Sequence, residues 1–321
     1  MGIQEITLDR LDPAGFIAQK SRELSAAVGE GFAVNALSGG VDSSVVTALG
    51  HKALGSRLKT YFIDNGIMRK DEPAQIAAQF RSIGIPIEIV DAKDRFFAAL
   101  KGLSDPEEKR EAITQTFYKD VFGELVKRSK ARILLQGTIF TDVEETVAGV
   151  KRQHNILSQL GIDTVEQFGY EVVEPLIELR KPGVRKVGEA LGLPLDMYNR
   201  PPFPGPALAA RVLGEVTPAR VALVREATAI VEEELAGSGA FQYLAILHED
   251  RVTGIRDGKR DYGSQIEVRC WESKDAKTAA PTRLDYDILQ KIAARMTSEV
   301  PGVVSVTYNI TSKPTSTIEA V

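Results

Sequence analysis

The sequence of 321 residues is 43% hydrophobic and carries a formal net charge of −4, with 40 Lys and Arg against 44 Asp and Glu. A protein that coats nucleic acid needs a basic surface, so this charge balance argues against nucleic-acid binding. Because Cys270 is the only cysteine, an intrachain disulfide and a cysteine-based metal cluster are excluded. The sequence shows no signal peptide and no apolar run of about 18 residues, so we expect a soluble, cytoplasmic protein without membrane segments.

The first half of the chain alternates between strand and helix patterns. Apolar runs predict strands at residues 32–37, 58–64, 86–91 and 133–136, with a short fifth at 171–174. Helical spacing of apolar residues predicts helices at 41–54, 72–83, 106–130 and 182–193. The first strands begin about 28 residues apart, which is typical of right-handed βαβ units. We therefore predict an α/β fold with a doubly wound parallel sheet.

A proline-rich segment at residues 199–207 interrupts this alternation. Its prolines donate no backbone hydrogen bond, which excludes a helix or a central strand. Beyond it, the patterns predict helices at 218–235 and 284–300 and strands at 241–247, 251–255, 265–271 and 303–310, with an Asp-Gly turn before the third strand. We expect a first domain at 1–198, a linker at 199–207 that either only connects or also positions substrate, and a smaller α+β domain at 208–321.

The segment at residues 38–44 follows the first predicted strand and opens the first predicted helix. It consists of Ser38, Gly39, Gly40, Val41, Asp42, Ser43 and Ser44. A helix N-terminus offers unpaired amide groups and a partial positive charge, which suit a phosphate. The glycines let the backbone close around an anion, and the serines add hydroxyl donors. Asp42 would repel a phosphate unless a cation lay between them, so it indicates Mg²⁺.

Other interpretations of this segment fit less well. It lacks the lysine of a Walker P-loop. Residues 36–40 are similar to a nucleophile elbow but lack its first glycine, and the chain has only three histidines to complete a serine-hydrolase triad. A Gly/Ser turn that caps a helix would explain any two of the seven residues, but not all of them in this strand–loop–helix context.

Residues 38–44 resemble the SGGxDS pyrophosphate loop of the N-type ATP pyrophosphatases, which cleave ATP between its α and β phosphates and adenylate a substrate oxygen. Further blocks narrow the resemblance to the GMP synthetases. They include FIDNG at 62–66, DPEEKR at 105–110, QGTI at 136–139, FPGP at 203–206, RVLGEV at 211–216 and the closing KP and TIE at 313–314 and 317–319. The blocks cover nearly the whole chain and include no glutaminase domain. The chain thus resembles the separate ATP-pyrophosphatase subunit of two-subunit GMP synthetases.

This resemblance implies an adenine nucleotide alpha hydrolase-like fold, with ATP and Mg²⁺ as cofactors and Asp42 on the metal. It implies a reaction in two steps, in which the C2 oxygen of XMP attacks the α-phosphate of ATP and ammonia then displaces AMP to give GMP. It also implies a separate glutamine amidotransferase subunit as a partner and a homodimer formed through the C-terminal domain.

Two strand ends supply candidate residues for the nucleotide and the reacting purine. Asp64, Asn65 and Gly66 follow the second strand, and Gln136, Gly137 and Thr138 follow the fourth. Doubly wound sheets bind ligands at the carboxyl edge of their strands, where both groups would lie. Ordinary strand-to-helix turns are the alternative.

Two further groups have an uncertain role on residues alone. Asp142 and Glu145 would bind a second Mg²⁺ or orient ammonia, or else cap a helix. Lys151, Arg152, His154 and Asn155 lie in a long stretch with weak patterns, which is typical of a lid or of a charged surface. The resemblance also implies XMP ligands in the second domain, namely Arg211, Arg269, Lys313, Ile318 and Glu319.

The departures from the family pattern fall in the lid and the second domain. The family's KSHHNVGG is KRQHNILS at residues 151–158, and the last glycine of PFPGPGL is Ala207. The chain would accordingly be a divergent GMP synthetase subunit, a paralogue that adenylates another nucleotide or acceptor, or a non-catalytic nucleotide-binding regulatory protein. The intact loop at 38–44 favours the first hypothesis.

Overall fold

A computed structural model describes residues 3–147, 170–198, 203–274 and 276–320. The contacts within it divide the chain into two compact units. The first unit contains Met1–Asp64, Glu72–Ala92 and Gln115–Arg200, and the second contains Asn65–Asp71, Lys93–Thr114 and Pro201–Val321. Two segments from the first third of the sequence therefore belong with the C-terminal part of the chain.

The first unit contains a parallel sheet in the strand order β3-β2-β1-β4-β5. Its strands are β1 (Ala33–Leu37), β2 (Leu58–Asp64), β3 (Glu88–Asp91), β4 (Ile133–Leu135) and β5 (Glu171–Val173). Nearly every residue of β1 and β2 is buried, which is why these strands are continuous apolar runs in the sequence. The predicted doubly wound sheet is confirmed, and the winding reverses between the neighbouring strands β1 and β4.

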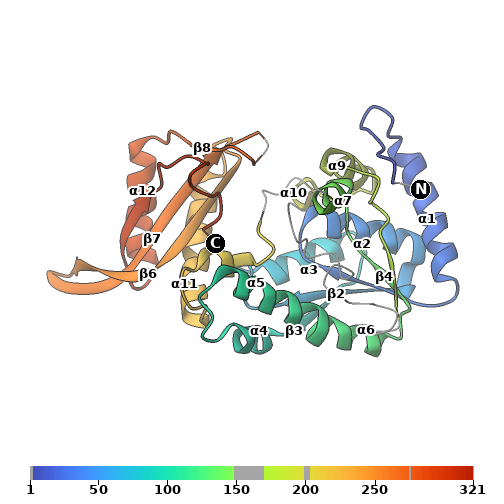
Figure 1. The fold of residues 1–321 in the computed structure, drawn as a ribbon, viewed down its shortest axis with the longest axis horizontal. Coiled ribbons are helices and arrows are strands. Elements are labelled where there is room, and N and C mark those ends of the chain that lie inside the picture. Colours follow the sequence, from blue (N-terminus) through green and yellow to red (C-terminus); the bar gives the residue numbers. More distant parts are fainter. Residues whose placement is uncertain (1–2, 148–169, 199–202, 275, 321) are drawn as a thin grey trace. The chain divides into compact units, whose positions relative to one another are not determined.

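Helices cover both faces of this sheet (Figure 1). They are α1 (Pro13–Val28), α2 (Val41–Leu54), α3 (Glu72–Ser82), α6 (Gly123–Ser129), α7 (Phe140–Val147), α9 (Lys181–Ala190) and α10 (Leu195–Tyr198). Helices α1, α2 and α9 pack against one another. Figure 1 shows α2 and α9 on one side of the sheet and α6 on the other.

The helix expected at 106–130 is a helical stretch of three segments. It consists of α5 (Pro106–Gln115), a π-helical segment (Thr116–Phe122) and α6. The expectation was correct for its position but not for its regularity. Periodicity of apolar residues shows that a helix exists, but not that one turn within it is wider.

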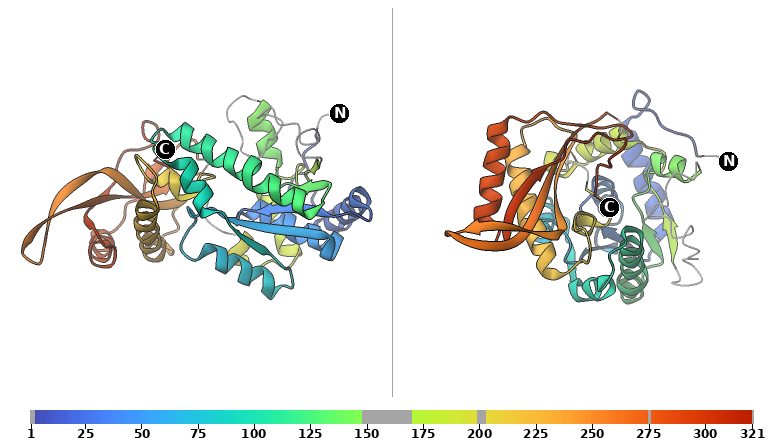
Figure 2. Two further views of the ribbon diagram at one scale, coloured as in Figure 1. Left: turned by 90° about the horizontal axis from the view of Figure 1, so that it is seen from below. Right: turned by 60° about the vertical axis from the view of Figure 1, so that its left-hand side comes forward.

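The second unit is an α+β assembly, as expected. Its helices are α4 (Lys93–Leu100), α5, α11 (Pro218–Leu235) and α12 (Tyr286–Glu299), and its strands are β6 (Gln242–Arg256), β7 (Lys259–Glu272), β8 (Ala280–Pro281) and β9 (Val303–Tyr308). Strand β7 pairs antiparallel with β6 and β8 and parallel with β9. Figure 2 shows the tips of β6 and β7 extending beyond α11 and α12.

The strands expected at 241–247 and 251–255 form the single strand β6, with a register irregularity between Leu247 and Arg251. The Asp-Gly turn after it has positive φ at both Asp257 (50°) and Gly258 (73°), as a tight hairpin requires. Trp271 packs in the core of this unit with Leu244, Ile246 and Ile318.

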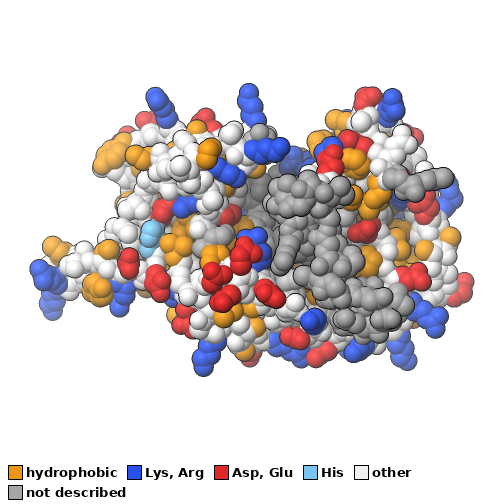
Figure 3. All heavy atoms as spheres, in the orientation of Figure 1, with side chains coloured by type: hydrophobic (Ala, Val, Ile, Leu, Met, Phe, Trp, Pro, Cys, Tyr) orange, Lys and Arg blue, Asp and Glu red, His pale blue; other side chains and the backbone are white. Residues whose placement is uncertain are grey.

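Basic and acidic side chains are interspersed over the face shown in Figure 3. This distribution agrees with the near balance of 40 basic and 44 acidic residues. Within the described segments, no helix has the length and apolar character needed to cross a membrane.

Candidate nucleotide-binding site

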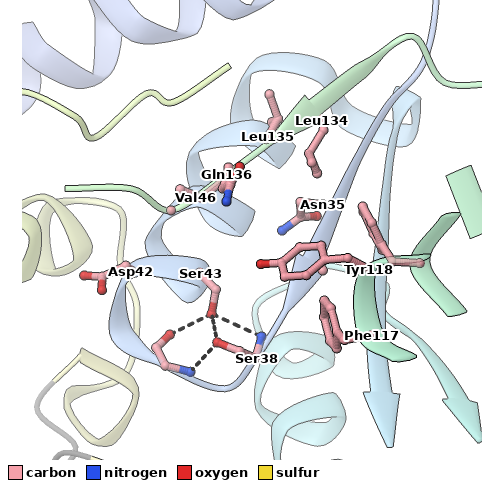
Figure 4. Close-up of a pocket in the computed structure, with 14 residues that line it drawn as sticks. Asn35, Ser38, Asp42, Ser43, Val46, Phe117, Tyr118, Leu134, Leu135 and Gln136 are labelled. Atoms are coloured by element: carbon pink, nitrogen blue, oxygen red, sulfur yellow. Dashed lines mark hydrogen bonds between the residues drawn. The ribbon is translucent and has the colours of Figure 1, made fainter. Parts of the chain in front are cut away.

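The loop at residues 38–44 connects the end of β1 to the start of α2 and is closed by its own serines (Figure 4). The Ser43 hydroxyl donates to the carbonyl of Gly40 over 3.0 Å and accepts from the amide of Ser38 over 3.2 Å. The hydroxyls of Ser38 and Ser43 also lie 3.0 Å apart. Gly39 has a φ of 76°, which favours glycine. The loop is thus ordered around an exposed helix N-terminus before any anion binds.

Asp42 lies in the first turn of α2 and has one oxygen engaged and one without a partner. Its Oδ2 accepts from Lys181 Nζ over 2.5 Å, and Lys181 is the first residue of α9. Its Oδ1 is buried without a hydrogen-bond partner. A buried carboxylate oxygen without a donor is unfavourable and suits a cation.

Asp42 therefore fits the Mg²⁺ that the sequence indicates. Mg²⁺ in nucleotide sites is commonly held by one or two carboxylates together with substrate phosphates. The described residues contain no group of three or more His, Cys, Asp or Glu that would hold a metal by themselves. Asp42 would supply the protein ligand, and phosphate oxygens would complete the coordination.

Gly137 allows the end of β4 to approach the start of α2. A Cβ at this position would lie 3.2 Å from the carbonyl carbon of Asp42 and 3.2 Å from the amide nitrogen of Ser43. Few side chains tolerate contacts this short with backbone, so glycine is favoured here. The sequence-predicted residues of the first and fourth strands are therefore in direct contact.

A pocket opens between the ends of β1 and β4, at the point where the winding of the sheet reverses. Doubly wound sheets bind ligands at this kind of position. Ser38, Gly40, Asp42 and Ser43 form one side of the pocket, and Gln136 and Gly137 lie across from them. It encloses about 120 Å³, which is close to the cavity of about 150 Å³ that holds one benzene ring.

The π-helical segment supplies the aromatic wall of this pocket. Phe117, Tyr118 and Phe122 line it, and Figure 4 shows the Tyr118 ring facing the space beside Asn35. Burial raises the pKa of the Tyr118 hydroxyl, with a smaller contribution from Tyr170. The hydroxyl therefore stays protonated at any physiological pH. π-Helical turns occur frequently at functional sites.

The remaining residues of the two strand ends have structural partners. Thr138 donates to Glu174. Asn65 Oδ1 accepts from the amide of Ile67 over 3.0 Å in a turn of the second unit. Gly66 has a φ of 76°, and its carbonyl accepts from Arg225. Asp64 is 9% exposed at the end of β2.

The acidic pair beyond β4 is described only in part. Asp142 Oδ2 accepts from the backbone amide of Ile139 over 2.9 Å, which is the contact expected of an acidic residue near the start of α7. This contact favours helix capping as the role of Asp142. Glu145 belongs to α7, but its side chain lies outside the described residues, as do Lys151, Arg152, His154 and Asn155.

The candidates from the second domain gather around the C-terminal segment. Arg211 is fully buried, and its guanidinium donates twice to Glu319 over 3.2 Å. The Nη1 atom of Arg211 is buried without a partner. Arg269 donates to the carbonyls of Thr317, Ile318 and Glu319, and Lys313 donates to the carbonyl of Ala276. The predicted ligands thus engage one another and the backbone, with one buried guanidinium nitrogen available.

Glu267 holds Arg269 in place from the neighbouring position on the same face of β7. It accepts from Arg269 Nε over 2.5 Å and from Asn309 over 2.9 Å, and it lies 2.9 Å from His248 Nε2. Burial by itself would raise the pKa of Glu267, but the hydrogen bonds from Asn309, Arg269 and His248 outweigh it and hold the pKa below 4.5.

Sequence reasoning missed Lys181, Asn35 and the aromatic residues of the π-helical segment. No local pattern singles out Lys181, because it meets Asp42 only through the packing of α9 on α2. Asn35 carries a weak signal, since it is a polar residue in the middle of a buried strand.

Comparisons with known proteins agree with this geometry. The family model "NAD synthase" matches residues 16–206, and the model "GMP synthase C terminal domain" matches residues 230–320. One of the two subunits named for "GMP synthase [glutamine-hydrolyzing]" in Thermococcus kodakarensis is 46% identical over 95% of this chain and 98% of its own length. The proteins of the same name from Archaeoglobus fulgidus and Methanocaldococcus jannaschii are 46% and 44% identical over 96% of this chain and 99% of their own lengths. Because relatives this similar span nearly the whole sequence, the chain belongs to this family of glutamine-hydrolysing GMP synthase subunits.

Proposed function

We propose that this chain is the synthetase subunit of a two-subunit GMP synthase, which converts XMP, ATP and ammonia to GMP, AMP and pyrophosphate. The observation that carries the proposal is the closed serine loop at the start of α2, with the unpartnered oxygen of Asp42 beside it. A helix N-terminus with this donor set suits the leaving pyrophosphate.

In the first step, the C2 oxygen of XMP attacks the α-phosphorus of ATP, and the bond to the β-phosphate oxygen breaks. Mg²⁺ held by Asp42 and phosphate oxygens would supply charge neutralisation. The loop amides and the hydroxyls of Ser38 and Ser43 would bind the pyrophosphate as it leaves. No protein nucleophile is needed, because alignment and charge stabilisation carry the step.

In the second step, ammonia adds at C2 of the adenylated purine and AMP leaves with the former C2 oxygen. The relatives are named as one subunit of a glutamine-hydrolysing enzyme, which supports a separate amidotransferase partner as the source of ammonia. Arg211, Arg269, Lys313, Ile318 and Glu319 would contact XMP after some of their present bonds exchange for the nucleotide.

The direct test is pyrophosphate release by the purified chain from ATP and Mg²⁺ with XMP and an ammonium salt. We expect AMP, pyrophosphate and GMP in equal amounts. The same assay with IMP in place of XMP tests the paralogue hypothesis, and absence of AMP and pyrophosphate with every acceptor would point to a non-catalytic protein.

Replacing Asp42 tests the assignment of the metal ligand. We expect Asp42→Asn to lower turnover at least about 100-fold, in the range that removal of a charge-stabilising group produces. The exposed Asp9→Asn, which makes the same chemical change away from the loop, serves as the control. Equal turnover in the two variants would remove Asp42 from the metal site.

A further inference from the structure

Asn35 is a polar residue in the middle of β1 and is only 1% exposed. The hydroxyl of Thr60 in β2 donates to its Oδ1 over 2.7 Å, and its Nδ2 donates to Thr47 Oγ1 in α2 over 2.6 Å. Thr47 in turn donates to the carbonyl of Ser43 over 2.7 Å. A chain of three hydrogen bonds therefore runs from β2 through β1 to the pyrophosphate loop.

This chain of bonds fixes the direction in which the Asn35 amide points. A hydroxyl has one hydrogen, and the carbonyl of Ser43 can only accept, so it takes the hydrogen of Thr47. Thr47 must then accept from Asn35, which places the amide nitrogen toward Thr47 and the amide oxygen toward Thr60. The opposite orientation would leave Asn35 Oδ1 without a donor.

One amide hydrogen of Asn35 is not used by these bonds. An amide nitrogen carries two hydrogens, and among the described residues Asn35 Nδ2 donates only to Thr47. Asn35 also lines the pocket between β1 and β4, and Figure 4 shows its nitrogen on the side of the pocket that Gln136 and Tyr118 border. A buried donor without an acceptor is unfavourable, so the pocket favours an occupant with an acceptor atom at this point.

We propose that Asn35 is a specificity-determining residue, whose remaining amide hydrogen donates to a ring nitrogen of the nucleobase in this pocket. Thr60 and Thr47 are the positioning residues that hold the amide in this orientation. The proposal rests on the proposed function, because it takes ATP as the nucleotide. Purine rings carry acceptor nitrogens at N1, N3 and N7, and the room for about one ring fits a base rather than a whole nucleotide.

Deaza analogues of ATP, in which one ring nitrogen is replaced by carbon, test this contact. With the wild-type chain we expect one of 1-deaza-, 3-deaza- and 7-deaza-ATP to bind about 5- to 30-fold more weakly than ATP, as the loss of one hydrogen bond predicts. In Asn35→Leu the same analogue and ATP should bind within about twofold of each other, as in a double-mutant cycle. Calorimetric titration in the absence of XMP measures all of these affinities without turnover.

Two further variants control for damage to the site. Thr60→Val removes the donor that orients Asn35 and should reduce the penalty for the same analogue. Gln136→Leu replaces the other amide that lines the pocket and should leave the ratio between analogue and ATP unchanged. If Asn35→Leu does not fold, Thr60→Val carries the comparison.

The outcomes separate this proposal from the proposed function. Equal affinity for ATP and all three analogues, or an equal penalty in the wild type and Asn35→Leu, would overturn the role of Asn35 while leaving GMP synthesis intact. Discrimination that disappears in Asn35→Leu, in a chain that forms no GMP, would support Asn35 and contradict the proposed reaction.

Discussion

At the scale of single residues, the pairing of Asp42 with Lys181 places a basic side chain beside the pyrophosphate loop. The lysine is 42% exposed and its ammonium contacts only one of the two oxygens of Asp42. When a cation occupies Asp42, Lys181 loses part of this attraction and becomes a donor for a phosphate oxygen. The sequence did not predict this second positive group, and the geometry makes it part of the site.

We expect Lys181→Met to raise the KM for ATP about 10- to 100-fold with a smaller effect on kcat, because a hydrogen bond from a charged donor to phosphate is worth about 1.5–3 kcal/mol. Steady-state kinetics at varied ATP concentration measures it. Lys186→Met is the matched control, since Lys186 is exposed on the same helix. A similar rise in KM for both variants would show that only the general charge of α9 matters.

Ala207 occupies a backbone conformation that suits glycine. Its φ is 52° although it is a buried alanine, and the related sequence pattern has glycine at this position. A left-handed conformation costs an alanine about 1–2 kcal/mol. The buried methyl group and the lower entropy of the unfolded chain return about the same amount.

Ala207→Gly should therefore change the free energy of unfolding by less than about 1 kcal/mol, because strain relief offsets the losses. Ala210→Gly, at a buried position of ordinary φ three residues later, should lower it by about 1.5 kcal/mol. Urea unfolding of the two variants gives the comparison. Equal destabilisation would mean that the conformation of Ala207 is not strained.

At the scale of helices and strands, regular elements could be predicted from the sequence, and contacts between them could not. The helix at Val41–Leu54 and the strand at Leu58–Asp64 begin and end as predicted, since burial leaves a periodic pattern. The π-helical segment leaves no such pattern, so its role as a pocket wall emerged only from the fold. Lys181 meets Asp42 across 139 positions of sequence, which no local pattern encodes.

The network on β7 predicts how the second unit responds to acid. The pKa of Glu267 is held below 4.5 in the folded chain, whereas in the unfolded chain it returns to about this ordinary value. The unfolded state therefore binds more protons in the interval between the two, so stability falls as the pH falls. The contribution of Glu267 is fully present above pH 4.5 and is lost as the pH passes through the folded pKa.

Glu267→Gln should make the free energy of unfolding less dependent on pH below 4.5 than in the wild type. Urea unfolding at a series of pH values between neutral and about 3 measures this dependence. Glu272→Gln, at the exposed end of the same strand, is the control and should keep the wild-type dependence. The same flattening in both variants would assign the effect to the overall charge.

At the scale of the whole molecule, the second unit is assembled from distant parts of the sequence. The amide of Leu208 donates to the carbonyl of Ile67 over 2.9 Å, and Arg225 donates to the carbonyl of Met68 over 2.8 Å. Lys109 in α5 is 1% exposed and donates to the carbonyl of Val212 over 2.9 Å. Burial lowers the pKa of Lys109, with Arg220 adding to the effect, so the bond to Val212 offsets part of the cost of a buried ammonium.

The segments Asn65–Asp71 and Lys93–Thr114 thus complete the second unit, although a linker at 199–207 would suggest an independent domain after it. A fragment of residues 203–321 lacks both segments and exposes the carbonyls and apolar groups that they cover. We expect it to melt without cooperativity, or at least about 10 °C below the full chain, since a loss of about 2 kcal/mol shifts Tm by this amount in a domain of this size. Calorimetry measures both transitions.

Joining residues 93–114 to the N-terminus of this fragment through a flexible Gly/Ser linker should restore part of the lost stability, because α5 again brings Lys109 to Val212. The same fusion with Lys109→Met keeps the apolar contacts of α5 but removes the bond to Val212, and it separates the two contributions. A fragment of 203–321 that unfolds cooperatively at the temperature of the full chain would show that the C-terminal part forms a self-sufficient domain.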